Sequence, residues 1–113
     1  MPFYDFNTKQ TINIWTGING AFYHSDQLTF GHVTLDKGAI VGDHAHPHEQ
    51  WTHVLEGEIE FTIAGETNIL TKGMAAFIPS NAIHSAKALT ACKVLDCFLP
   101  TREDFIDKET NSL

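Results

Sequence analysis

Short strand-forming runs separated by turn signals constrain the fold of this chain most strongly. Between residues 11 and 99, β-branched and aromatic residues gather in short runs, and Gly, Pro, Asn or Asp interrupts them roughly every eight to twelve residues. No long stretch has the 3.6-residue periodicity of an amphipathic helix. These patterns predict an all-β sandwich or barrel.

The same turn-forming residues set the boundaries of the expected elements. We expect strands over residues 11–16, 28–35, 50–55, 58–63, 67–70, 74–78, 84–88 and 92–99. The segment Gly17-Ile18-Asn19-Gly20 is expected to be a turn, because Asn-Gly is a strong tight-turn dipeptide. Pro100 should end the sheet, and Arg102 to Lys108 has the charge and spacing for about one turn of helix.

The length of 113 residues suits one small globular domain and leaves no room for two. We expect a single domain over residues 1–113, with a core at about 28–107 and an N-terminal arm at about 1–10 that packs on a neighbouring subunit. Cys92 and Cys97 lie five residues apart in one expected strand, so they should project to opposite faces and remain free thiols.

Charge and composition exclude several function classes. Seven basic and fourteen acidic residues give a formal net charge of −7, which is the wrong sign for gripping nucleic acid phosphates. No uncharged apolar stretch approaches the roughly 18 residues of a membrane span, and the N-terminus lacks the features of a signal peptide. We therefore expect a cytoplasmic protein that binds neither nucleic acid nor membrane.

Histidines are unusually numerous and closely spaced in this sequence. Of seven histidines, His44, His46, His48 and His53 fall within ten residues. A spacing of i and i+2 directs two imidazoles to one side of an extended strand, and His84 follows a later break in the chain. Three imidazoles with one oxygen donor suit nickel, zinc, iron or manganese, and do not suit calcium or magnesium.

The histidines belong to two longer segments. These read Gly38-x5-His44-x-His46-Pro47-His48-Glu49-Gln50-x6-Gly57 and Gly73-x5-Pro79-x-Asn81-x2-His84. Together they resemble the paired motifs of the cupin superfamily, the RmlC-like jelly rolls, over about residues 28–107. The resemblance implies a double-stranded β-helix, or jelly-roll barrel, with one divalent metal in its mouth. The implied ligands are His44, His46, Gln50 and His84.

Several features of these motifs leave alternatives open. Strand parity alone would also include His48, whereas the resemblance selects Gln50 in the place where the family pattern has glutamate. Gln50 could instead anchor a substrate hydroxyl. The second motif departs from the pattern at Asn81 and Ala88. Because three neutral imidazoles and an amide leave a divalent ion with its full charge, the site should prefer an anionic, oxygen-rich ligand. Metal affinity should fall as the pH drops through about 6.5.

A second group of candidate functional residues lies near the carboxyl end of the chain. Asp96 stands in the middle of an apolar strand, where burying its charge costs several kcal/mol unless it is compensated. Phe98 shares its face, and Arg102 is the only arginine in the chain. A guanidinium can grip a carboxylate with two parallel hydrogen bonds. Arg102 could therefore bind an acidic ligand, or pair with Asp96 or with an acid of the tail.

The Asp-x-Phe-x3-Arg spacing, combined with His-x-His-Pro-His-Glu-Gln, resembles a narrower family. These are the pectin-degradation (KdgF-like) cupins, which linearise the unsaturated uronates released by pectate and alginate lyases. The resemblance implies that Asp96, Phe98 and Arg102 line the metal pocket. For the mechanism we expect Asp96 to be the general base, Arg102 to bind the substrate carboxylate and Phe98 to pack against the sugar.

The function expected from the sequence is therefore metal-dependent ring opening of an unsaturated monouronate. The partner would be a small anionic sugar or another small acid. The alternatives are a metal-dependent dioxygenase and a non-catalytic module that binds a small acid. We also expect a homodimer, because cupins commonly dimerise through their sheets. With eight Phe, two Trp and two Tyr, a barrel this small should also expose apolar surface that a second subunit would cover.

Overall fold

Two antiparallel β-sheets and one C-terminal helix make up the computed structural model, which describes residues 2–111. The helix is α1 (Glu103–Asn111), and within the described range no helix is long and apolar enough to cross a membrane. The all-β prediction is confirmed. The strands are β1 (Ile12–Trp15), β2 (Ile18–His24), β3 (Thr29–Leu35), β4 (Ile40–His44), β5 (Glu49–Glu56), β6 (Ile59–Ile63), β7 (Glu66–Leu70), β8 (Ala75–Ile78), β9 (His84–Ala88) and β10 (Cys92–Leu99).

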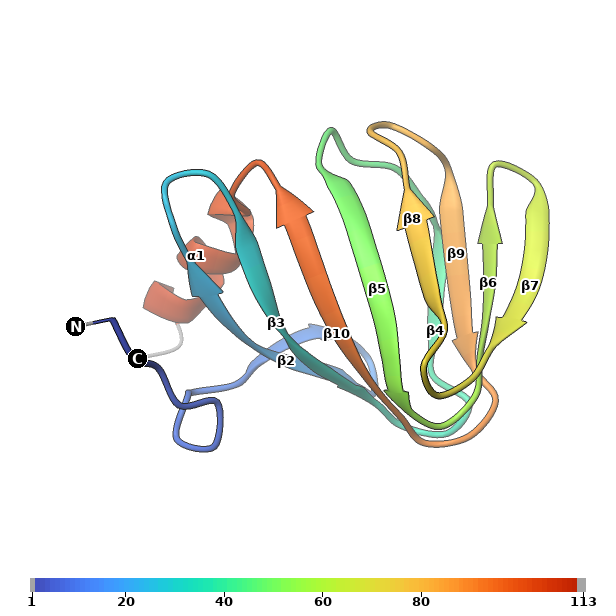
Figure 1. Ribbon diagram of the computed structural model, residues 1–113, viewed down its shortest axis with the longest axis horizontal. Helices are drawn as coiled ribbons and strands as arrows, with labels where there is room; N and C mark the ends of the chain where they lie inside the picture. The colour runs from blue at the N-terminus through green and yellow to red at the C-terminus, as the bar shows by residue number, and fades with distance from the viewer. Residues whose placement is uncertain (1, 112–113) are drawn as a thin grey trace.

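The two sheets face each other, and the core lies between them (Figure 1). The six-stranded sheet has the order β1-β2-β3-β10-β5-β8, and the four-stranded sheet has the order β4-β9-β6-β7. Strands β4, β5 and β6 follow one another in the chain but alternate between the sheets. Helix α1 lies beside the β1–β3 end of the larger sheet (Figure 1). Because consecutive strands alternate between the sheets, segments far apart in the sequence meet at the same end of the sandwich.

Alternation of side chains across the strands builds the core, as the sequence predicted. In β3, Thr29, Gly31, Val33 and Leu35 are buried while Phe30 is exposed. The largest apolar side chains with less than 2% of their surface exposed come from both sheets, which accordingly share one apolar interior. They are Phe22, Val54, Ile59 and Ile78.

Strand β10 runs through the centre of the six-stranded sheet, between β3 and β5. Every second residue from Cys92 to Phe98 is buried, and the series includes Asp96. Cys92 and Cys97 point to opposite faces, and both are free thiols as predicted. The strand ends at Leu99, immediately before Pro100. Asp96 is the only carboxylate among the buried residues of the described chain.

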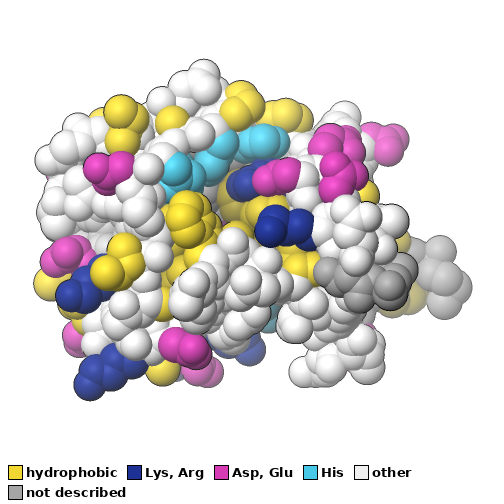
Figure 2. Space-filling model, turned by 180° about the vertical axis from the view of Figure 1, so that it is seen from behind, with side chains coloured by type: hydrophobic (Ala, Val, Ile, Leu, Met, Phe, Trp, Pro, Cys, Tyr) yellow, Lys and Arg dark blue, Asp and Glu magenta, His cyan; other side chains and the backbone are white. Residues whose placement is uncertain are grey.

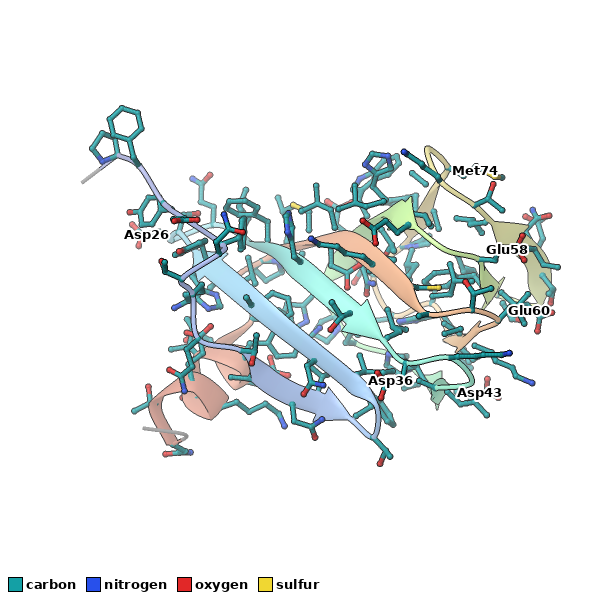
Figure 3. The ribbon with its side chains drawn as sticks, turned by 90° about the horizontal axis from the view of Figure 1, so that it is seen from below. Asp26, Asp36, Asp43, Glu58, Glu60 and Met74 are labelled. Atoms are coloured by element: carbon teal, nitrogen blue, oxygen red, sulfur yellow. The ribbon has the colours of Figure 1, made fainter. Side chains whose placement is uncertain are left out.

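The acidic residues otherwise lie at the periphery. Figure 3 shows five of them at turns or near strand ends around the edge of the molecule, namely Asp26, Asp36, Asp43, Glu58 and Glu60. The excess negative charge is therefore spread over the surface, where water screens it.

The prediction of a turn over residues 17–20 is wrong. The chain reverses at Thr16 and Gly17, whose φ of 75° favours glycine, and Asn19 and Gly20 belong to β2. Gly20 serves close packing instead, because a Cβ there would lie 2.5 Å from the Phe22 ring. β4 was also not among the predicted strands.

Helix α1 is longer than the single turn expected over residues 102–108. It has nine residues and buries Phe105, whose ring lies 4.6 Å from that of Phe22 and 5.6 Å from that of Phe98. Most helical stability in proteins comes from such tertiary packing. A pattern of charge and spacing in this short segment could not anticipate these contacts.

The N-terminal arm contacts this chain's own sheet. The Tyr23 hydroxyl donates a 2.7 Å hydrogen bond to the carbonyl oxygen of Asp5, and the Phe6 ring stacks on His32 with centroids 4.3 Å apart. Met1 lies outside the described residues. Packing of the arm on a neighbouring subunit stays a prediction.

Candidate metal centre

Three histidines from two distant segments meet at one end of the sandwich. His44 is the last residue of β4, His84 is the first residue of β9, and the two are paired in register. His46 follows β4 by two residues. One ring nitrogen from each of the three lies within 4.8 Å of the others. The cluster predicted from the spacing is therefore present in the fold.

Hydrogen bonds fix which ring nitrogen of each histidine faces the cluster. Because a carbonyl oxygen only accepts, each Nδ1 near one carries the proton, and the Nε2 lone pair of a neutral ring is left to bind a ligand. This is how metal-binding histidines are usually oriented. The pairs are His44 Nδ1 with Gly42 O at 2.8 Å, His46 Nδ1 with His48 O at 2.9 Å, and His84 Nδ1 with Ala82 O at 2.8 Å.

The donor atoms of the cluster suit a metal ion. His84 Nε2 is buried and has no hydrogen-bond partner within residues 2–111, a situation that costs about 1–3 kcal/mol for a polar atom. A cation bound to it would remove that cost. Burial, followed by the charge of Arg102, lowers the pKa of His46 to about 4, and burial also lowers the pKa of His84. Both rings are neutral at pH 7, as metal ligands must be. Proton competition at His46 therefore begins below the pH of about 6.5 that an ordinary histidine predicts.

Gln50 directs its carbonyl end at the cluster. Its Nε2 donates a 2.9 Å hydrogen bond to Thr52 Oγ1, which leaves Oε1 facing His46 Nε2 at 3.2 Å. With His46 neutral and its proton on Nδ1, both facing atoms are electron-rich. Two such atoms approach each other favourably when a cation lies between them. This arrangement fits Gln50 as the fourth ligand, the role implied by the family resemblance.

Asp96 lies next to this amide, across the sheet. Thr52 on β5 is paired in register with Asp96 on β10, and the Thr52 hydroxyl donates a 2.6 Å hydrogen bond to Asp96 Oδ1. Burial raises the pKa of Asp96 to about 6, and hydrogen bonds from Thr52 and Gln50 offset part of that rise. A carboxyl group with such a pKa can both accept and return a proton near neutral pH.

Sequence reasoning did not identify Thr52. It belongs to β5, two residues after Gln50 and on the same face, and both are buried. The parity of the strand with Gln50 could have selected it, but threonine is common in strands. Only the register of β5 against β10 reveals its partner.

Arg102 does not pair with Asp96; it pairs with an acid of the tail. Its Nε donates to Asp104 Oδ1 at 2.9 Å and its Nη2 donates to Asp104 Oδ2 at 2.7 Å. This pair lowers the pKa of Asp104. The guanidinium also lies over the rings of Phe98, at 4.7 Å, and Phe105, at 4.0 Å. Arg102 is thus held in one position beside the pocket.

The remaining histidines stay outside the cluster. His48, which strand parity alone would have included, is not one of the three clustered residues. His53 lies exposed on β5. His24 and His32 contact Glu109 and Phe6 respectively, away from the site.

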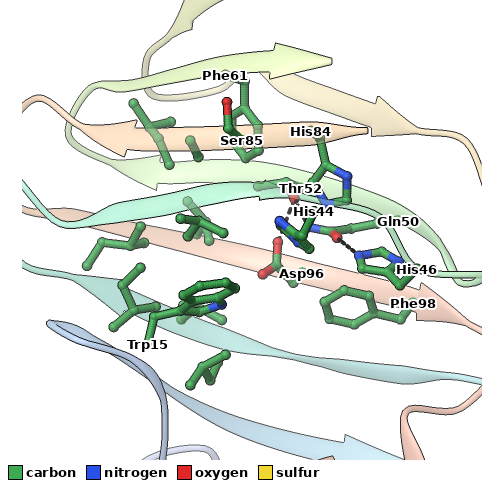
Figure 4. Close-up of a pocket in the computed structure, with 18 of the residues that line it drawn as sticks. Trp15, His44, His46, Gln50, Thr52, Phe61, His84, Ser85, Asp96 and Phe98 are labelled. Atoms are coloured by element: carbon green, nitrogen blue, oxygen red, sulfur yellow. Dashed lines mark hydrogen bonds between the residues drawn. The ribbon is translucent and has the colours of Figure 1, made fainter. Parts of the chain in front are cut away.

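A pocket connects the cluster to Asp96. Figure 4 shows Asp96, Thr52 and Gln50 leading from the pocket interior to the histidines. From behind, Figure 2 shows histidines at one rim of a hollow with a hydrophobic floor and basic side chains across from them. The arrangement can bind a small acid near a metal and exchange a proton with it. Apolar residues from both sheets form the walls, including Val33, Leu35, Ile59, Phe61 and Val94.

Comparisons with known proteins agree with this geometry. The family model described as "Cupin domain" matches residues 31–98. An RmlC-like cupin from Shewanella frigidimarina is 31% identical, with a TM-score of 0.87 over 93% of this chain and 96% of that one. KdgF from a Halomonas species is 30% identical, with a TM-score of 0.86 over 93% of this chain and 98% of that one.

More distant structures share the fold alone. A protein from Thermotoga maritima described as a predicted oxalate decarboxylase is 19% identical, with a TM-score of 0.77 over 87% of this chain and 98% of that one. Among curated protein sequences, no significant match is found.

Proposed function

The chain belongs to the cupin family, and on that premise we propose that it is a metal-dependent enzyme that opens the ring of unsaturated monouronates. The strongest support is the position of a buried carboxylate, Asp96, in the same pocket as the three-histidine cluster. The 30% identity to Halomonas KdgF over nearly the whole of both chains supports the same assignment.

A divalent metal would be held by His44, His46 and His84 through Nε2 and by Gln50 through Oε1. Nickel, zinc, iron and manganese all suit these donors. When bound, the metal supplies Lewis-acid stabilisation for negative charge that develops on the sugar oxygen. The neutral amide of Gln50 adds no charge of its own, so the metal keeps its attraction for an anionic substrate.

Asp96 would move the proton. In an unsaturated uronate the ring oxygen joins the anomeric carbon C1 to the double bond between C4 and C5. Asp96 takes the proton of the C1 hydroxyl, the bond between C1 and the ring oxygen breaks, and C1 becomes an aldehyde. The electron pair stays on the former ring oxygen as an enolate at C5. Asp96 then delivers the proton to C4, which leaves a ketone at C5. The reaction is an isomerisation without net oxidation.

Arg102 would bind the uronate carboxylate. Its Nε and Nη2 are held by Asp104, and no described residue accepts a hydrogen bond from its Nη1. Fixing the guanidinium in advance lowers the entropy lost when the substrate binds. Its positive charge also lies near Asp96 and lowers the pKa of that carboxyl group, which favours the ionised base.

The test is to incubate the metal-loaded protein with unsaturated monouronate and follow the loss of the enol-ether absorbance, with the linear keto product identified by NMR. We expect loss well above the rate without protein, and no acceleration by His84→Ala. Oxygen consumption during turnover would indicate a dioxygenase instead. Tight binding by calorimetry without any product would indicate a non-catalytic binding module.

A further inference from the structure

A β-bulge turns one tryptophan into the pocket. Strands β1 and β2 pair Ile12 with Gly20 and Asn13 with Asn19, but the next pair is Trp15 with Ile18, so β1 contains one extra residue at this point. By simple alternation Trp15 would share the outer face with Asn13. Instead, the consecutive residues Ile14 and Trp15 both line the pocket. Bulges next to sites commonly redirect a side chain in this way.

The side chain of Asn13 holds the bulge in place. Its Nδ2 lies 2.8 Å from the carbonyl oxygen of Trp15, 3.2 Å from that of Ile18 and 3.2 Å from Asn19 Oδ1. These contacts connect both strands on either side of the turn at Gly17. Trp15 is thus presented to the pocket by a defined local structure.

Of the Trp and Phe side chains that line the pocket, that of Trp15 is the most exposed, and it can contact a ligand. It is 39% exposed, whereas Phe98 is 3% exposed and is covered by Arg102 and Phe105. Phe61 and Phe105 line the same pocket but are also buried. The Trp15 ring lies 5.6 Å from that of His44. Figure 4 shows Trp15 beside the same pocket as Asp96 and the clustered histidines.

We propose that Trp15 is a substrate-binding residue whose indole packs against the sugar ring and positions it in the pocket that Asp96 and the histidine cluster share. This inference rests on the function proposed above. The C–H groups of a sugar face can pack on an indole, and an exposed aromatic gains by covering that surface. Since the contact exists in the bound ground state as well as in the transition state, it should affect KM more than kcat.

The first test is steady-state kinetics of Trp15→Ala and Trp15→Phe. Trp15→Ala should raise KM roughly tenfold, the equivalent of about 1.4 kcal/mol, with kcat within about threefold and metal content unchanged. Trp15→Phe should lie between Trp15→Ala and the wild type. Asn13→Ala, which frees the bulge, should raise KM in the same direction. The matched control is Trp51→Ala, because Trp51 is the other tryptophan and lies outside the pocket.

The outcomes separate this inference from the proposed function. Wild-type turnover with an unchanged KM in Trp15→Ala would overturn the role of Trp15 alone. A loss of bound metal in Trp15→Ala would also overturn it, since Trp15 would then support the histidines. An absence of turnover by the wild type would remove the proposed function, and this inference with it.

Fluorescence gives a second readout that does not depend on turnover. In Asp96→Asn combined with Trp51→Phe, Trp15 is the only tryptophan, and unsaturated monouronate should change its emission saturably. In Asp96→Asn combined with Trp15→Phe, the emission of Trp51 should stay constant. Saturable binding by calorimetry without any change in Trp15 emission would contradict the proposed contact.

Discussion

The hydroxyl of Thr52 donates a 2.6 Å hydrogen bond to the buried carboxylate of Asp96. The same oxygen accepts a hydrogen bond from Gln50, so one threonine connects the implied metal ligand to the implied base. A hydrogen bond to the ionised form stabilises that form and keeps the pKa of Asp96 from rising further.

Replacing Thr52 by valine should therefore raise the pKa of Asp96. The acid limb of the kcat/KM profile should move to higher pH by up to about one unit, and activity at pH 6 should fall more than activity at pH 8. Thr52→Ser, which keeps the hydroxyl, is the control and should retain the wild-type profile. If the profile of Thr52→Val superimposes on that of the wild type, the hydrogen bond does not tune the base.

Asp96 should destabilise the folded protein at neutral pH. Its pKa is about 6 in the folded chain and 3.8 as its ordinary value. Between these two pH values the folded protein holds a proton that the unfolded chain has released, so the free energy of unfolding falls as the pH rises. The loss is complete above pH 6 and is at most about 3 kcal/mol.

Asp96→Asn removes this titration. Below pH 4 its free energy of unfolding should be close to that of the wild type, and above pH 6 it should exceed the wild-type value. Urea denaturation of both proteins in chelator, from pH 4 to pH 7, measures the difference. Two curves that stay parallel over this range would show that Asp96 is not held with a raised pKa. The same variant should lose at least about a hundredfold in turnover while retaining metal.

Metal binding should depend on the three clustered histidines and not on their neighbours. His46→Ala or His84→Ala should weaken nickel or zinc binding by about a hundredfold or more, since even indirect supports of a metal contribute ten- to hundredfold. His53→Ala is the control, because His53 is exposed on the other face of β5. Calorimetry on metal-free protein measures the affinities. Equal affinities in all three variants would rule out the cluster as the metal site.

The two-residue period of the strands made much of the fold predictable. In β3 and β10 every second residue is buried, because each strand has one face on the core. The prediction failed at residues 17–20, where local turn chemistry favoured Asn19-Gly20 and the packing of Phe22 instead required a glycine inside β2. That requirement comes from tertiary contact and is invisible in a dipeptide.

The candidate site, like the fold, was predictable from the sequence only in part. The spacing of His44, His46 and His84 predicted their convergence, and the family resemblance added Gln50. Thr52 emerged only from the register of β5 against β10, and Trp15 only from a one-residue bulge that reverses the parity of β1. A single inserted residue changes the face of every side chain after it, so such positions need the paired strands to be known.

The outer face of the six-stranded sheet supports the expectation of a homodimer. Two adjacent cross-strand rows on this face contain no Asp, Glu, Lys or Arg, although the chain carries a net charge of −7. Phe6 covers the end near β2, but Trp51 is 51% exposed and Phe77 is 41% exposed, with their rings 4.9 Å apart. The first row is Phe77, Trp51, Cys97, Phe30 and Tyr23, and the second is Ala75, His53, Leu95, His32 and Ala21.

We expect a second copy of the chain to cover this uncharged face, because two acidic molecules repel least where neither presents a charge. Light scattering coupled to gel filtration should give a dimer for the wild type. Trp51→Glu combined with Phe77→Glu should give a folded monomer, since the pair places like charges within the contact. Ile69→Glu is the matched control, because Ile69 is 50% exposed on β7 of the other sheet and its substitution should leave the dimer intact. A monomeric wild type, or a dimer that survives the double substitution, would place the interface elsewhere or remove it.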